Sequence, residues 1–343
     1  MTEEKITGYI FIPLYNVTLS PDLLHTRIAG FKVITAEDYF SSYRPKFFRE
    51  NSVLSTKDLD DDVRIPFPGM LSEHPYAKYL LVKQIRTGLP YTKETSDELD
   101  RLIKDSVNEF YHFVVAARLY KDGHLQAFRY YAYSKTYAFG GGLPFASSWN
   151  EIETFFSFRF LYLKYFNLEK SDIRKIYRLS KKIQKNLKTM ESSTIFFSAY
   201  YGTSDVYDKL LRLITILEML LTNDSKQELN YRLLMRASCL LKRNVFQILK
   251  LAYDCRSRFI HSGTTGDESL KKLKQLYPKN PESDTDNRTN EELIFQLIQT
   301  DLEKIVRDTL NAILNLVDKT GKSIGDIDKD LDQKILSQIT KNA

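Results

Sequence analysis

The second half of this chain repeats one pattern, in which apolar residues recur every three or four positions, as on one face of an α-helix. The longest such stretch begins at Thr289, where Thr-Asn-Glu-Glu is a capping box, and keeps its apolar register to Val317. Helices with one apolar face and short connections pack as an up-and-down bundle. Residues 146–343 are therefore expected to form an all-α domain. Its other helices are expected over 152–166, 171–188, 205–221, 226–241, 245–262 and 327–339.

The polar stretch 264–288 interrupts this pattern and contains Pro278 and Pro281. It is expected to be a long mobile loop or an insertion. Ser204 and Asn244 are expected to cap the helices that follow them, since each is a small polar residue directly before an apolar periodic stretch.

The first half has strand signals instead. Ile6–Tyr15 and Phe31–Ile34 are rich in β-branched and aromatic residues, which predicts strands. A capping box at Thr95–Glu98 predicts a helix that runs to about Val107. Phe110–Tyr120 and Leu125–Tyr137 are expected to pair as a hairpin because Asp-Gly lies between them. Residues 1–145 are therefore expected to form an α+β domain with a β-hairpin, serving recognition or regulation.

Gly140–Pro144 follows the second of these expected strands. It lacks the lysine and the Ser/Thr of a phosphate-binding loop, so we interpret it as a flexible hinge between the two domains.

Composition narrows the class of protein. Charged residues make up 27% of the chain and hydrophobic residues 43%, as in a globular protein. No apolar run approaches the roughly 20 residues that cross a bilayer, and no secretory signal is visible. Two cysteines, Cys239 and Cys255, are too few for a disulfide framework or a cysteine-rich metal site. A cytoplasmic protein with no membrane segment, metal or cofactor is expected.

Positive charge is concentrated in one expected helix. The chain has a formal net charge of +6, whereas 170–188 alone contains eight Lys/Arg and one acid, Asp172. Arg174, Arg178, Lys181 and Lys182 lie off the apolar stripe of that helix. They form either a solvated outer face or a surface that contacts RNA phosphates.

The end of one helix has the residues of an anion-handling site. Phe246–Gly263 begins as an apolar helix, and its last turns contain Arg256, Arg258 and His261 before Ser262-Gly263 ends it. A histidine can move a proton from a ribose 2′-OH or to a leaving oxygen, and guanidinium groups stabilise charge on phosphate. Such chemistry needs no metal. The alternative is structural, because Arg and His suit the dipole at a helix C-terminus.

The sequence spacing of Arg256 and His261 puts them on different sides of a regular helix. Arg256 and His261 are five residues apart, which puts them about 140° apart around a regular helix. Arg258 and His261, at i and i+3, are better placed as neighbours. A second copy of the helix in one cleft would remove the difficulty.

Tyr253–Gly263 resembles the terminal R-x-x-x-x-H signature of HEPN domains, in particular the Apea-like group. Leu211–Leu221, with Leu217-Glu218 near its centre, is similar to the family's Leu-Glu helix, and Tyr231–Leu241, which includes Arg236, to the helix that follows it. The resemblance covers about 204–263. It implies a helical bundle that dimerises and brings two motifs into one cleft.

The same resemblance implies a function. Many HEPN proteins are metal-independent endoribonucleases that leave 2′,3′-cyclic phosphate ends, in toxin, antiphage or RNA-processing systems. By position, Arg256 would bind phosphate and His261 would be the acid/base, whereas any role of Arg258 rests on geometry. Glu218 and Arg236 would form a buried structural pair or line the cleft. Ser257 departs from the Asn, His or Asp of many active members, and some HEPN domains only bind RNA, nucleotide or partner proteins.

Overall fold

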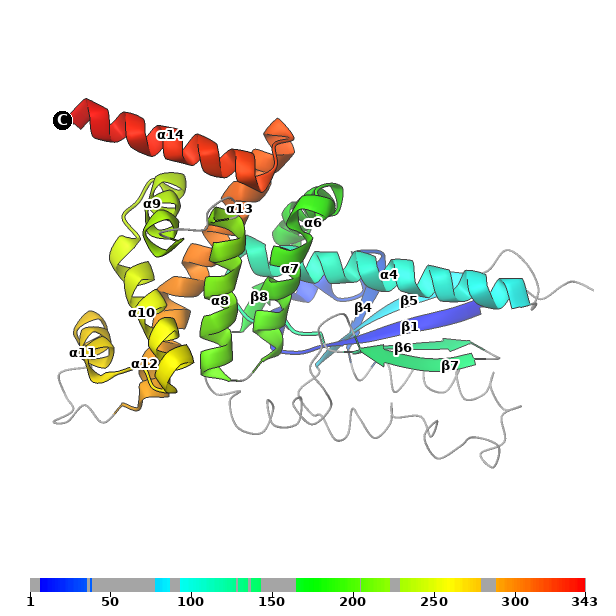
Figure 1. The fold of residues 1–343 in the computed structure, drawn as a ribbon. Coiled ribbons are helices and arrows are strands. Elements are labelled where there is room, and N and C mark those ends of the chain that lie inside the picture. Colours follow the sequence, from blue (N-terminus) through cyan, green and yellow to red (C-terminus); the bar gives the residue numbers. More distant parts are fainter. Residues whose placement is uncertain are drawn as a thin grey trace, which may run out of the picture. The chain divides into compact units, whose positions relative to one another are not determined.

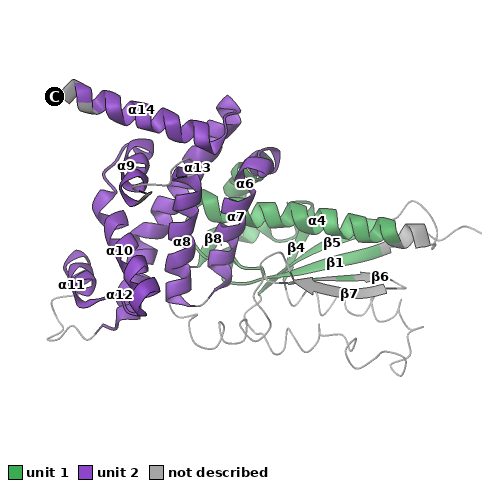
Figure 2. Ribbon diagram, in the orientation of Figure 1, with its two compact units in different colours: residues 1–146, 161–181 green, residues 147–160, 182–343 purple. Residues whose placement is uncertain are grey.

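The computed structural model describes residues 7–35, 38, 78–86, 93–127, 129–134, 137–142, 165–203, 205–222, 229–278 and 288–342. The chain divides into two compact units (Figure 2). Unit 1 comprises Met1–Ala146 and Leu161–Lys181, and unit 2 comprises Ser147–Phe160 and Lys182–Ala343. An α+β part thus precedes a helical part. The expected single boundary at residue 145 assigns 161–181 to the helical domain, whereas the structure groups them with unit 1.

Unit 1 is built on a six-stranded antiparallel sheet (Figure 1). The central strand β1 pairs with β5 on one side and β6 on the other. Residues 10–14 of β1 are all buried, which explains why this strand reads as one apolar run rather than an alternation. In order across the sheet, the strands are β3 (Arg27–Ile28), β4 (Phe31–Thr35), β5 (Tyr79–Arg86), β1 (Thr7–Leu14), β6 (Arg129–Ser134) and β7 (Tyr137–Gly142).

Strands β1 and β4 confirm the predictions at Ile6–Tyr15 and Phe31–Ile34. The prediction of a hairpin between Phe110–Tyr120 and Leu125–Tyr137 was wrong in its first strand, because Phe110–Tyr120 is the end of the long helix α4 (Lys93–Tyr120). Side chains on several sides of this end are buried, among them Phe113, Val114 and Val115, so the apolar run reflects a helix enclosed by the core. A short apolar run does not distinguish a buried helix from a strand.

Helix α4 lies against the sheet, with the Phe110 ring 5.7 Å from the ring of Phe31 on β4 (Figure 1). The hairpin observed is β6–β7, in which Gly140, Gly141 and Gly142 pair with Tyr131, Tyr130 and Arg129. These glycines are part of a strand and not of the expected hinge. Leu143 and Pro144 lie outside the described residues, as do residues 152–164 of the helix expected over 152–166, whose last residue, Phe166, lies in a strand.

A short parallel pair explains why a later segment belongs to unit 1. β2 (Val17–Leu19) pairs with β8 (Phe166–Leu168), and helix α6 (Lys170–Lys185) follows β8 directly. Lys121, just after α4, pairs with Asp172 in the first turn of α6. These contacts join the start of α6 to the sheet domain, and the division between the units falls inside α6 after Lys181.

Unit 2 is a helical bundle. The capping box at Thr289 is confirmed, since its hydroxyl accepts from the Glu292 N–H and the Glu292 carboxylate accepts from the Thr289 N–H. Asp205 caps α8 by accepting from the N–H of Asp208, in place of the expected Ser204, which is outside the described residues. The helices are α7 (Leu187–Gly202), α8 (Val206–Leu221), α9 (Leu229–Leu241), α10 (Phe246–Ser262), α11 (Asp267–Leu276), α12 (Asn290–Leu297), the π-helical turn η5 (Ile298–Leu302), α13 (Glu303–Thr320) and α14 (Ile324–Asn342).

Two helices of unit 2 were not expected. Helix α11 occupies part of 264–288, so the prediction of one long loop there was wrong. Leu273 of α11 is fully buried, which shows that the segment packs into the bundle. The buried face of helix α7 mixes apolar Met190 and Phe197 with Ser193, Thr194 and Ser198, so its apolar periodicity is weak. Polar contacts to α13 help to hold it. The hydroxyls of Tyr200 and Tyr201 each donate to Glu303 on α13 over 2.7 Å, and Arg307 donates to the same carboxylate over 2.6 Å.

Helix α14 is held by a buried arginine. Arg236 of α9 has no exposed surface and contacts Asp328 at 3.0 Å and Asp332 at 2.6 Å, both on α14. Its third partner is the carbonyl of Leu221, which accepts over 2.6 Å. Among the described residues, no helix combines the length and the apolar character that a bilayer crossing requires.

Candidate functional site

The end of α10 is where the Arg–His motif lies. The helix runs without interruption through Arg256 and His261 to Ser262. Gly263 then adopts φ 71°, a left-handed conformation that favours glycine, and its N–H donates to the carbonyl of Phe259 over 2.9 Å. The motif therefore occupies the last two turns of a regular helix, as the sequence predicts.

Helix α10 is fixed against α8 near the motif. The rings of Tyr207 and Phe259 stack with centroids 4.0 Å apart and planes within 5° of parallel. Cys255 is completely buried on the same helix, and burial raises the pKa of its thiol to about 11. A thiol with so high a pKa is not a nucleophile at neutral pH, so Cys255 is a packing residue.

Arg256 points toward α8. Its Nη2 lies 3.4 Å from Oε2 of Glu218, and its guanidinium lies over the Tyr253 ring, 5.5 Å from the centroid. The Nε atom of Arg256 is buried and has no acceptor among the described residues. Burial raises the pKa of Glu218, and the nearby Arg256 opposes this shift only in part. The pair is therefore a loose one, with most donors of the guanidinium left unused.

His261 faces elsewhere. Its side chain is exposed, and the regular geometry of α10 turns it about 140° away from Arg256. The neighbouring Ile260 is 52% exposed, so the last turn of α10 has an open surface. The structure brings Arg256 to Glu218 and leaves His261 apart from both.

Arg258 forms an ion pair with Glu268 of the next helix. Its Nη2 lies 3.4 Å from Oε2 of Glu268 on α11, and both side chains are largely exposed. The turn before α11 passes close to Arg258, because a Cβ on Gly266 would lie 2.5 Å from its Nη1. Nη1 is the far end of a flexible side chain and can move, so the preference for glycine at position 266 comes from its positive φ of 73°.

Glu218 and Arg236, which were expected either to pair with each other or to line a cleft, have separate partners. Glu218 contacts Arg256, and Arg236 lies in the buried cluster with Asp328 and Asp332. The sequence indicated Glu218 only as part of a helix motif, and nothing in its spacing linked it to Arg256 on another helix.

The four expected RNA-contact residues of α6 fall into two classes. Arg174 and Arg178 are exposed and have no carboxylate partner among the described residues. Lys181 contacts Glu109 on α4 at 3.2 Å. Lys182 donates to Asn315 over 2.8 Å and lies 3.9 Å from Asp318, both on α13. In the described part of the chain, Arg174 and Arg178 are thus the two that could meet phosphate without giving up a carboxylate or amide contact.

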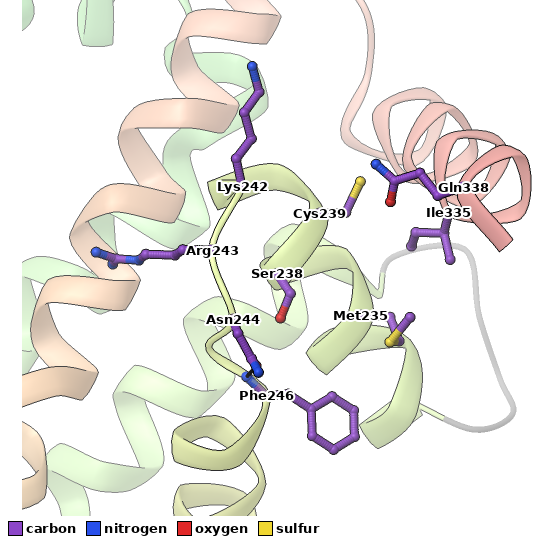
Figure 3. A pocket seen from close by; sticks show the side chains of 9 residues that line it. All are labelled: Met235, Ser238, Cys239, Lys242, Arg243, Asn244, Phe246, Ile335 and Gln338. Carbon is purple, nitrogen blue, oxygen red and sulfur yellow. Dashed lines mark hydrogen bonds between the residues drawn. The ribbon is translucent and has the colours of Figure 1, made fainter. Parts of the chain in front are cut away.

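A pocket in unit 2 lies at the opposite end of α10 from the motif (Figure 3). It has a volume of about 690 Å³ and is lined by α9, α14 and the start of α10. Phe246 is ten residues before Arg256, or about 15 Å along the helix. Lys242 and Arg243 point away from Cys239 and Gln338 in Figure 3, and Arg243 is paired with Asp308 at 2.7 Å. This pocket therefore adds no catalytic group to the motif.

Metal ligands are not clustered in the described part of the chain, where no three His, Cys, Asp or Glu side chains could hold one ion. Comparison of the chain with protein-family models, curated proteins and solved structures finds no match.

Proposed function

We propose that the protein is a metal-independent endoribonuclease whose reacting groups are Arg256 and His261. The observation that supports this most is the state of Arg256. Its guanidinium is positioned by Tyr253 and by one 3.4 Å contact with Glu218, yet keeps donors that a phosphate oxygen could accept from. A side chain held in place with spare donors suits the binding of a phosphodiester better than a purely structural role.

In the proposed reaction, the 2′-oxygen of a ribose attacks the adjacent phosphorus and the bond from phosphorus to the 5′-oxygen breaks. The His261 imidazole removes the proton from the 2′-hydroxyl, and the leaving 5′-oxygen takes up a proton from water. Arg256 stabilises the negative charge that develops on the phosphoryl oxygens. The products are a 2′,3′-cyclic phosphate end and a 5′-hydroxyl end.

Two copies of the chain would supply the groups that one copy keeps apart. Within one helix, His261 is turned about 140° from Arg256. If two α10 ends share a cleft, the arginine of one chain can face the histidine of the other. A homodimer formed through unit 2 is therefore part of this proposal.

The test is incubation of the purified protein with mixed RNA in the presence of a chelator. We expect cleavage with cyclic phosphate ends, and a loss of about 10²- to 10⁴-fold in His261→Ala, the usual contribution of a general acid or base. Lys250→Ala is the matched control, since Lys250 is exposed on the same helix and outside the motif. If His261→Ala cleaves as fast as the parent, the assignment of His261 is wrong.

The two-chain site has a separate test. Arg256→Ala and His261→Ala proteins, each inactive alone, are mixed under conditions that exchange subunits. We expect activity to return in part, because the mixed dimer has one intact arginine facing one intact histidine. No recovery, with exchange verified by mass spectrometry, would contradict the shared cleft.

A second candidate function is RNA binding without cleavage. It is favoured by Glu218, which contacts Arg256 at 3.4 Å, and by Arg174 and Arg178 on α6, which have no carboxylate partner among the described residues. It predicts an RNA complex that weakens steeply as salt rises. Replacement of Arg174 and Arg178 by Gln would weaken this complex, whereas His261→Ala would leave it unchanged.

A further inference from the structure

A second pocket lies entirely within unit 1, and it concerns neither α10 nor the motif. Its volume is about 540 Å³, within the range of roughly 300–1,000 Å³ that is usual for small-molecule sites. It is lined by the segment before β3, by the β3–β4 turn, by α4 and by the first two turns of α6. Its lining includes Arg27, Gly30, Glu109, Lys170, Arg174 and Tyr177.

One wall of this pocket is a tight hairpin turn. Ile28 pairs with Phe31, so Ala29-Gly30 is a two-residue loop, and both residues have positive φ, 49° and 81°. Such a turn matches the twist of the two strands it joins. The segment before it is also fixed, since the Thr26 hydroxyl donates to the Leu23 carbonyl over 2.7 Å and the Val33 N–H donates to Thr26 over 2.9 Å. The wall is therefore formed before any ligand binds.

Charge in the pocket is unbalanced. Arg27, Lys170 and Arg174 all line it, and none has a carboxylate partner among the described residues. Glu109 is the acidic residue that lines it, and Lys181 already neutralises this carboxylate at 3.2 Å. Three cations around one cavity repel one another unless an anion is present. Two guanidinium groups and one ammonium group are a suitable set for phosphate.

The pocket also offers a surface for a ring. Tyr177 is 40% exposed, and Lys181 lies over its ring, 5.2 Å from the centroid. Ile173 lines the same side from the preceding turn of α6. Aromatic and aliphatic side chains beside cations are the arrangement on which a nucleobase stacks while its phosphates are bound.

We propose that this pocket binds a nucleoside phosphate, with Arg27, Lys170 and Arg174 on the phosphates and Tyr177 beside the base. A free inorganic anion would contact the three cations, but it would neither contact the Tyr177 ring nor fill the pocket. The proposal gives the sheet domain a ligand of its own, and it does not depend on ribonuclease activity.

The test is isothermal titration of the full-length protein with ATP, GTP and inorganic triphosphate as probes. We expect at least one nucleotide to bind, and at least tenfold more tightly than triphosphate. Arg174→Gln and Arg27→Gln should each weaken it about tenfold or more, the usual effect of losing a charged hydrogen bond. Lys175→Gln is the matched control, because Lys175 is an exposed lysine of the same helix that lies over Tyr120 and outside the pocket.

Several outcomes would overturn the proposal. If inorganic triphosphate binds as tightly as both nucleotides, the base does not contribute to binding. Equal losses in Lys175→Gln and Arg174→Gln would indicate diffuse attraction by α6 and not a pocket. Binding of a short RNA with no binding of either nucleotide would point to a polymer surface. Thermal melts of each variant verify folding, and His261→Ala should bind nucleotide as the parent does, which separates this result from the fate of the ribonuclease proposal.

Discussion

Among the arginines of unit 2 that contact carboxylates, Arg236 and Arg256 do so in different ways. Arg236 has no exposed surface and meets Asp328 and Asp332 at 3.0 and 2.6 Å. Arg256 is partly exposed and meets Glu218 once, at 3.4 Å. The first arginine uses its donors to hold three helices together, whereas the second keeps most of its donors unused. Short contacts to several partners are therefore typical of a structural arginine, whereas a loose single contact leaves an arginine able to bind a ligand.

The pKa shifts of Asp332 and Glu218, which contact these two arginines, support this distinction. The hydrogen bond from Arg236 lowers the pKa of Asp332, so that carboxylate is more stable ionised in the folded protein than in water. Burial raises the pKa of Glu218 despite the nearby Arg256. The Glu218–Arg256 contact therefore does not compensate for the loss of water around Glu218.

The largest expected effect on stability is the difference between replacing Arg236 and replacing Arg256. Arg236→Met leaves Asp328 fully buried without its cation, which should lower the free energy of unfolding by about 3–5 kcal/mol. Arg256→Met should lower it by less than about 1 kcal/mol, because Glu218 keeps access to water. Urea unfolding followed by far-UV circular dichroism measures both. Similar losses of stability in the two variants would contradict the distinction between a structural Arg236 and a loosely held Arg256.

A smaller effect concerns Asp332, whose side chain is 35% exposed. Because its pKa is lowered in the folded state, it stabilises the fold above the ordinary carboxyl value of 3.8, and this contribution is lost as the pH falls through the lowered pKa. Asp332→Asn should cost about 1 kcal/mol at pH 7, after allowance for screening by water. The difference between variant and parent should shrink in melts taken below pH 4. A constant difference across this range would contradict the ion pair.

The smallest expected effect on stability is that of Glu218→Gln, and its dependence on pH is opposite to that of Asp332→Asn. The raised pKa of Glu218 means that its stabilising contribution is complete below the ordinary value of 4.5 and is lost as the pH rises through the raised pKa. Glu218→Gln, which resembles the protonated form, should therefore equal the parent at pH 4 and be equally or slightly more stable at pH 7, by under about 1 kcal/mol. Thermal melts at the two pH values measure this. A loss above 2 kcal/mol at pH 7 would show that the Arg256 contact is structural.

Much of the helical half was predictable because its signals are local. The apolar periodicity of 205–221 and 245–262 and the capping box at Thr289 depend on residues within one or two turns, and the structure has helices there. Helix α7 was missed because buried tyrosine–glutamate hydrogen bonds to α13 hold it, and Glu303 is about a hundred residues away in the chain. The end of α4 was mistaken for a strand because burial on several sides hides helical periodicity.

The candidate sites divide in the same way. Residue spacing was enough to predict that Arg256 and His261 occupy one helix end and lie about 140° apart around it, because both follow from regular helix geometry. Only the tertiary structure decided that Arg256 pairs with Glu218 and Arg236 with Asp328 and Asp332, and that Arg27 of a hairpin lies beside Lys170 and Arg174 of α6. Those contacts join residues far apart in the chain, and the packing of sheet and helices, rather than local spacing, places them together.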